Sequence, residues 1–115
     1  MSPPLRRSLH LTPELLRLYS RRGNYHSDAD AAAEIGYTRL VAQGMQVAAP
    51  AYGLLLDVWG DDLLAQGTFT LKFVGMVTDG ETVDAEVTVD GDTASFAVTS
   101  GARTAIVGTA TRGTR

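Results

Sequence analysis

Residues 41–56 read VAQGMQVAAPAYGLLL, and this stretch decides the fold. It is the most apolar part of the chain, and small residues such as Gly44, Ala48, Ala51 and Gly53 lie among larger ones. Small residues let a helix approach a neighbouring layer closely, so the stretch predicts a long central helix packed against a sheet. Pro50 is a mild objection, because a proline inside a helix removes a hydrogen bond and bends the axis. The following residues 57–62 are expected to close the helix.

Downstream of this helix the period of the apolar residues changes to 2, which is typical of strands. Residues 69–73 and 83–89 alternate between apolar and polar side chains, and so do residues 94–98. Asp90-Gly91 indicates a hairpin turn, and a last strand is expected over residues 104–110. The acidic residues Glu81, Asp84 and Glu86 are expected on the solvated side of their strand.

Upstream of the helix, residues 5–11 predict a short strand, and Thr12 followed by Pro13 is a strong helix start. Residues 20–25 predict a loop that displays His26. A second short helix is expected over residues 30–35, with Ser27 or Asp28 as its cap and Gly36 as its stop.

This order of elements predicts an α+β fold in which a long central helix is wrapped by a curved antiparallel β-sheet. A single domain over residues 1–115 is expected from the length and from a hydrophobic content of 44%. One layer of sheet around one helix leaves a broad edge to cover, so at least a dimer is expected.

Composition excludes several classes of function. The chain has no cysteine, which rules out disulfides, thiolate nucleophiles and zinc-thiolate sites, and its two histidines are too few for a histidine-rich metal site. No apolar run approaches the length of a membrane span, and no apolar signal core follows the first residues, so a cytoplasmic location is expected. The net charge is −3 and the arginines are scattered, which argues against a nucleic-acid partner.

Several stretches between residues 24 and 45 carry a resemblance to a known family. Asn24-Tyr25-His26-Ser27-Asp28, then an alanine-rich segment and Ile35-Gly36-Tyr37, and finally Val41-Ala42-Gln43-Gly44-Met45 resemble the core signature of the MaoC-like hydratases and dehydratases. A weaker likeness over residues 73–83 extends the resemblance to almost the whole chain. It implies a hot-dog fold, in which a curved sheet wraps a long helix.

The resemblance also implies roles for individual residues. His26 matches the family's catalytic histidine, which handles protons during reversible water addition to an enoyl thioester. Gly44 matches the glycine whose backbone amide binds the thioester carbonyl oxygen, and a helix N-terminus is physically suited to that task. Asp28 matches a family acid that follows the histidine and is more plausible as a helix cap. No metal or redox cofactor is implied.

One departure from the family concerns the second acid-base group. The family has an aspartate five residues before the histidine, and this chain has Arg21 at that spacing. Arginine does not lose its proton in a protein, so it cannot act as a base.

Three accounts of the site remain open. His26 works with another acid, such as Asp28, Tyr52 or a carboxylate from a neighbouring subunit. Alternatively, the chain is a non-catalytic or half-site subunit of a heteromeric hot-dog complex. In the third account, the scaffold serves as an isomerase or cyclase in a biosynthetic pathway. A hot-dog thioesterase with Asp57 as its acid is a weaker option.

The favoured function is hydratase or dehydratase chemistry on an enoyl or β-hydroxyacyl thioester of fatty acid or polyketide metabolism. The acyl group would be carried by coenzyme A or by an acyl carrier protein. Arg21, Arg22 and Arg39 are expected contacts to the carrier's phosphate, unless they are ordinary solvated arginines. Asn24 and Met45 complete the expected substrate-binding residues. The expected assembly is a homodimer or a hetero-oligomer with another hot-dog subunit.

Overall fold

The computed structural model describes residues 3–19 and 40–113. The second short helix expected over residues 30–35 therefore lies outside the described residues. So do several expected site residues, which are Arg21, Arg22, Asn24, His26, Asp28 and Arg39.

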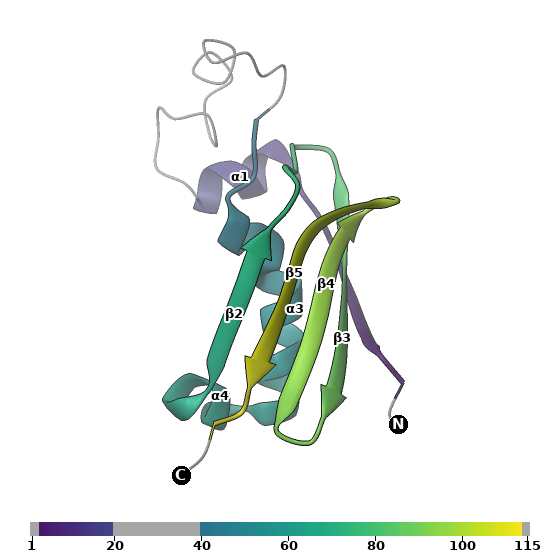
Figure 1. Ribbon diagram of the computed structural model, residues 1–115. Helices are drawn as coiled ribbons and strands as arrows, with labels where there is room; N and C mark the ends of the chain where they lie inside the picture. Colours follow the sequence, from purple (N-terminus) through teal and green to yellow (C-terminus); the bar gives the residue numbers. More distant parts are fainter. Residues whose placement is uncertain (1–2, 20–39, 114–115) are drawn as a thin grey trace.

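The described chain forms five strands and three helices (Figure 1). In chain order they are β1 (Leu5–His10), α1 (Pro13–Tyr19), α3 (Gly44–Trp59), α4 (Asp61–Gln66), β2 (Thr68–Phe73), β3 (Thr82–Asp90), β4 (Thr93–Ser100) and β5 (Arg103–Thr111). The strands make one sheet in the order β1-β3-β4-β5-β2, and each neighbouring pair is antiparallel. Each strand predicted from the period-2 alternation is present.

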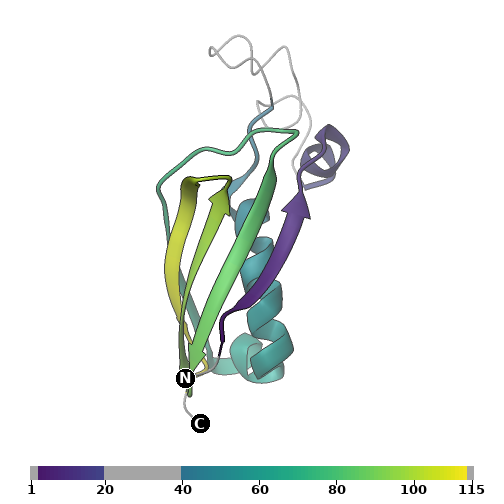
Figure 2. The same cartoon turned by 90° about the vertical axis from the view of Figure 1, so that its right-hand side faces the viewer.

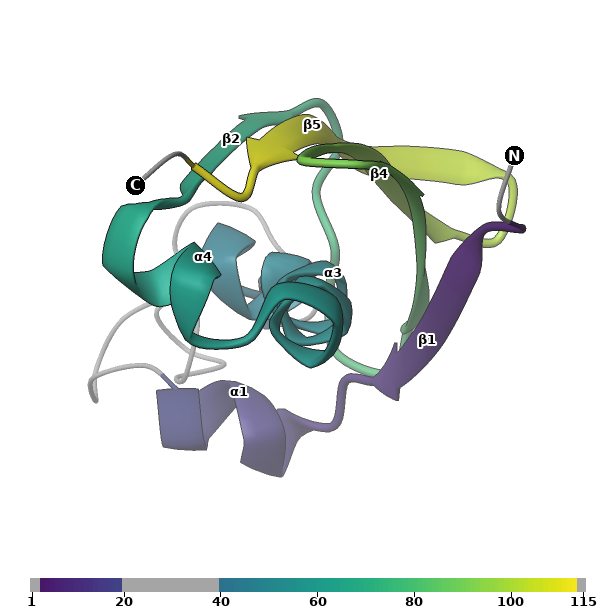
Figure 3. The ribbon, with the colours of Figure 1, turned by 90° about the horizontal axis from the view of Figure 1, so that it is seen from below.

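The sheet curves around α3. Figure 2 shows α3 lying along one face of the sheet, and Figure 3, seen from below, shows the strands bending around it from β2 to β1. In the same view α1 lies on the side of α3 away from β5, and α4 lies beside α3 near β2. This is the arrangement of a hot-dog fold, so the predicted fold class is confirmed.

The core forms where α3 meets the concave face of the sheet. Ala48, Ala51 and Leu55 of α3 are fully buried, and they belong to the same cluster as Val83 and Val87 of β3. The inward face of β3 follows from its alternation, because every second side chain of a strand points to the same side. The predicted small-residue face is therefore real at Ala48 and Ala51.

Two other small residues of α3 have different roles. Ala49 is exposed, so it does not contribute to the face against the sheet. Gly53 lies under the side chain of Arg7, whose Nη1 would be 2.5 Å from a Cβ at that position. Arg7 extends from β1 across the helix and forms an ion pair with Asp57, with 2.5 Å between Nη2 and Oδ2. This pair fastens the edge strand β1 to α3.

The structure corrects the bounds of the central helix. It begins at Gly44, three residues later than predicted, and ends at Trp59. Val41 forms an antiparallel bridge with Thr78, and the Ala42 amide donates to the Val77 carbonyl over 2.8 Å. Pairing with a distant segment therefore holds these apolar residues extended.

The end of the central helix also differs from the prediction. Gly60, with a φ of 58°, turns the chain into the unpredicted helix α4. Pro50 lies buried inside α3. The start of α1 matches the prediction, since the Leu15 amide donates to Oγ1 of Thr12 over 3.2 Å.

A matched pair of alanines on α3 tests the close approach of helix and sheet. Ala51→Leu will lower the free energy of unfolding by about 1–3 kcal/mol, because a larger side chain does not fit between the helix and the sheet. Ala49→Leu, at an exposed position of the same helix, will change it by less than about 0.5 kcal/mol. Urea unfolding of both variants measures the difference, and equal effects would contradict the packing described.

Candidate functional site

A cavity of about 470 Å³ opens at the N-terminus of α3. Its wall is formed by residues 41–45, by Phe73 at the end of β2, and by Met76 and Val77 of the connection that follows. Among the described residues of this wall, Gln43 alone carries a polar side chain. The cavity is therefore suited to an apolar group with a polar end near the helix.

The first residues of α3 do not cap its N-terminus with their own side chains. Gln43 is the N-cap residue, but its side chain makes no capping hydrogen bond, and the first turn contains no acidic residue. The first hydrogen bond of the helix runs from the Val47 amide to the Gln43 carbonyl over 3.1 Å. Amides before this point, including that of Gly44, have no acceptor within the helix. Their positive potential favours an oxygen that carries or develops negative charge.

Gly44 is in close contact with the ring of Phe73. A Cβ at Gly44 would overlap three ring carbons of Phe73, so no other residue fits there unless the ring moves. The glycine thus has a packing role, whatever its amide binds. Even so, 53% of Phe73 is exposed.

The turn at residues 77–81 connects the cavity wall to two other parts of the chain. The Asp79 amide donates to the Leu40 carbonyl over 2.9 Å, and the Gly80 amide donates to the Leu11 carbonyl over 2.6 Å. In return, the Leu11 amide donates to the Glu81 carbonyl over 2.9 Å. The turn therefore positions the approach to α3 and the chain between β1 and α1.

The carboxylate of Glu81 holds this turn in place. Its Oε2 accepts from the amide and the hydroxyl of Thr78, over 2.6 and 3.0 Å. Its Oε1 accepts from the hydroxyl of Ser100 over 2.8 Å and also binds the guanidinium of Arg103. Burial of Glu81 by itself raises its pKa, but the hydrogen bonds from Thr78 and Ser100 and the charge of Arg103 outweigh it, so the pKa is lowered. The prediction of a solvated Glu81 is wrong, since only 25% of its side chain is exposed.

The effect of Glu81 depends on pH with a defined sign. Because its pKa is lowered by folding, the carboxylate stabilises the protein above the ordinary glutamate pKa of 4.5 and loses this effect as the pH falls. Glu81→Gln will therefore lower the free energy of unfolding by roughly 1–3 kcal/mol at neutral pH. The difference between the two proteins will shrink on acidification. Urea unfolding across this pH range measures it, and a difference independent of pH would contradict the role of the charge.

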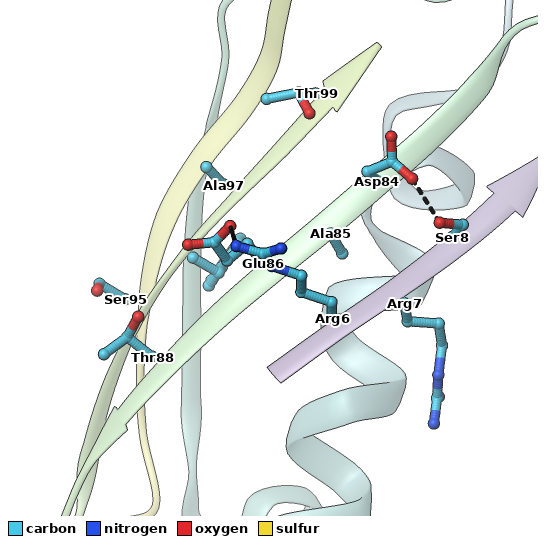
Figure 4. A pocket seen from close by; sticks show the side chains of 11 residues that line it. Arg6, Arg7, Ser8, Asp84, Ala85, Glu86, Thr88, Ser95, Ala97 and Thr99 are labelled. Atoms are coloured by element: carbon cyan, nitrogen blue, oxygen red, sulfur yellow. Dashed lines mark hydrogen bonds and ion pairs between the residues drawn. The ribbon is translucent and has the colours of Figure 1, made fainter. Parts of the chain in front are cut away.

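A larger hollow, of about 670 Å³, lies on the outer face of the sheet (Figure 4). Its charged groups already have partners, either across β1 and β3 or, for Arg7, in Asp57 of α3. Arg6 lies 3.3 Å from Glu86, and the Ser8 hydroxyl donates to Asp84. Asp84 and Glu86 are thus on the solvated side, as predicted. The first cavity, with its apolar wall and a helix start that the Gln43 side chain does not cap, is the better candidate site.

The structure brings together two of the predicted site residues. Gly44 and Met45 both line the cavity at the start of α3. Tyr52 lies farther along the helix, where its ring meets that of Phe69 edge to face at 5.2 Å, and it is not part of the described cavity wall. Its catalytic role stays a prediction, as do the roles of the residues between 20 and 39.

Phe73 and Glu81 were not predicted as part of the site. Alternation placed Phe73 on the inner face of its strand, but no sequence pattern showed that its ring would meet Gly44. In residues 3–19 and 40–113 no group of three or more histidine, cysteine, aspartate or glutamate side chains could hold a metal ion. None of the described helices is long and apolar enough to cross a membrane.

Asp57 lies far from the cavity, although a thioesterase would need it there. It is in the last turn of α3, thirteen residues after Gly44, which corresponds to about 20 Å along the helix. Its side chain is 64% exposed and bound to Arg7. This position does not favour the thioesterase interpretation.

Replacement of Asp57 tests whether its carboxylate acts as the acid of a thioesterase. Asp57→Ala will lower the free energy of unfolding by less than about 1 kcal/mol, because the ion pair with Arg7 is solvent-exposed. If the protein hydrolysed thioesters without Asp57, as its distance from the cavity predicts, the rate of hydrolysis would be the same in the variant and the wild type. A variant that is fully folded but inactive would place Asp57 in the site after all.

Comparison with known proteins identifies the class. The model of the family described as the MaoC like domain matches residues 1–111, and the chain belongs to this family. No curated protein matches the sequence.

Solved structures confirm the fold. An (R)-hydratase from A. caviae involved in PHA biosynthesis is 22% identical, with a TM-score of 0.76 over 96% of this chain and 94% of that one. The R-hydratase PhaJ1 from Pseudomonas aeruginosa is 20% identical, with a TM-score of 0.77 over 93% of this chain and 76% of that one. The HadBC (3R-hydroxyacyl-ACP dehydratase) complex from Mycobacterium tuberculosis is 22% identical, with a TM-score of 0.69 over 94% of this chain and 92% of that one. At these identities the likeness establishes the fold and not the reaction.

Proposed function

We propose that the protein is a hydratase or dehydratase of enoyl or β-hydroxyacyl thioesters carried by coenzyme A or an acyl carrier protein. The observation that carries this proposal is the position of Gly44. It opens a helix whose first amides are uncapped, and it does so in the wall of an apolar cavity. The (R)-hydratases that share the fold support the same general chemistry.

The reaction adds water across the C2–C3 double bond of the acyl group. Hydroxide from the water bonds to C3, a proton bonds to C2, and negative charge develops on the thioester oxygen in between. The Gly44 amide would donate a hydrogen bond to that oxygen. A positioned backbone donor of this kind typically contributes about 10²–10³-fold in rate. His26 would accept the proton from water and return one at C2, and the reverse sequence would eliminate water. The reaction requires no metal or redox cofactor.

The remaining expected residues have supporting roles in this proposal. Met45 would contact the acyl group in the cavity, and Asn24 would bind the substrate near His26. Arg21, Arg22 and Arg39 would meet the phosphates of the pantetheine carrier. Asp28 and Tyr52 are the candidates within the chain for the second acid-base group. The expected location is the cytoplasm.

The alternative is that the chain is the weaker subunit of a heteromeric hot-dog complex. Arg21 stands where the family has its aspartate, so the site lacks one of the two usual proton carriers. The similar structure of HadBC is itself a complex. Among the described residues, the edge strand β2 has one neighbour in the sheet, and its other side could pair with a second chain, either another copy or a different hot-dog subunit.

Enoyl-thioester hydration by the purified protein tests the proposal, with the two histidines as a matched pair. His26→Ala will reduce kcat at least about 100-fold, because it removes the group that moves the proton. His10→Ala will leave kcat unchanged, since His10 lies on the edge strand β1 and bonds to Thr82 at 2.8 Å. Equal effects of the two replacements would refute the role of His26.

A folded wild-type protein without turnover would contradict the stand-alone enzyme. Activity that then appears when a hot-dog subunit with the intact aspartate-to-histidine spacing is co-purified would support the heteromeric alternative. In that complex, His26→Ala in this chain will have little effect on turnover if the partner supplies the complete site.

A further inference from the structure

Phe73 lies where the edge of the sheet meets the start of α3. It is the last residue of β2, whose one neighbour in the sheet is β5. Phe69 and Leu71 of the same strand point to the helix side and pack against the core. The alternation of a strand brings Phe73 to that side too, where its ring contacts Gly44. The ring therefore stands directly beside the first peptide of the helix.

The ring of Phe73 is supported on one side and open on the other. It covers Gly44 so closely that a Cβ would overlap it, yet 53% of the residue is exposed. Because it also lines the cavity, it forms part of the wall that separates the cavity from solvent. A half-exposed side chain at the end of an edge strand can be changed with a smaller loss of stability than a buried phenylalanine.

The other side chains around Phe73 are apolar and partly adaptable. Met45 and Met76 line the same cavity and are 48% and 46% exposed, and thioether side chains adjust their shape readily. Val77 and Ile106 close the inner side and are buried. Among them the phenyl ring is the most rigid and the largest group. It is the part of the wall that best limits the size of what enters.

The contacts of Phe73 bear on which acyl groups the cavity can accept. Resting on the proposed function, we propose that Phe73 determines the length and bulk of the acyl group that the protein accepts. With the thioester oxygen on the Gly44 amide, the acyl carbons begin beside the Phe73 ring and extend along the apolar wall. A smaller residue at position 73 lengthens the space for those carbons, and a larger one shortens it.

Replacements of Phe73 in both directions test the proposal. Hydration of straight-chain enoyl thioesters from butenoyl to dodecenoyl is measured for the wild type, Phe73→Ala and Phe73→Trp. Phe73→Ala will raise kcat/KM for long chains relative to short ones by about fourfold for each additional methylene that the enlarged cavity buries. Phe73→Trp will shift the preference toward short chains. Val107→Ala is the matched control, because Val107 is a half-exposed residue of β5 outside the cavity wall, and it will leave the profile unchanged.

A second measurement keeps the test independent of turnover and of folding. Binding of saturated acyl thioesters of the same lengths, measured by calorimetry on the folded variants, will show the same shifts in length preference. Unchanged preferences in both Phe73 variants, with an active wild type, would overturn the inference and leave the proposed function standing. A wild-type protein that neither hydrates nor binds any thioester would overturn the proposed function and this inference with it.

Discussion

The burial of α3 against the concave face of the sheet is the constraint on which the rest of the structure depends. The helix approaches closely because Ala48 and Ala51 present almost no side chain to the strands. On the inner face of the sheet, the fully buried side chains of Val83 and Val87 belong to the same core cluster. Apolar burial of this kind is the main favourable term in folding, so the axis of α3 is set by it. The packing of the helix therefore also fixes the position of Gly44 and the other cavity residues at its N-terminus.

The N-terminus of α3 is placed at one end of the sheet as a consequence. There the helix is no longer covered completely by strands, because β2 ends at Phe73. The result is an apolar cavity with uncapped amides in its wall. A helix end without a side-chain cap gives up about 1 kcal/mol of stability, and such losses tend to occur at functional sites. The same helix therefore packs the core along its length and contributes the amides of the candidate site at its N-terminus.

Support for the cavity comes from a polar cluster outside it. Glu81 joins Thr78, Ser100 and Arg103, and the turn that it holds binds the backbone of Leu11 and Leu40. These two residues come from parts of the chain that are far apart in sequence. A single carboxylate therefore links the approach to α3, the end of β1 and the hairpin between β4 and β5. The cavity wall is held by polar contacts on one side and by the phenyl ring of Phe73 on the other.

The sequence by itself determined the types and the order of the elements, because the periods of the apolar residues and the turn signals are local. It also determined the family, since the residues around His26 and Gly44 carry a recognisable signature. Tertiary structure decided where α3 begins, because Val41 and Ala42 pair with a segment more than thirty residues away. It also decided the partners of Gly44 and Glu81. Contacts between distant segments depend on how the layers stack, and no local pattern in the chain encodes them.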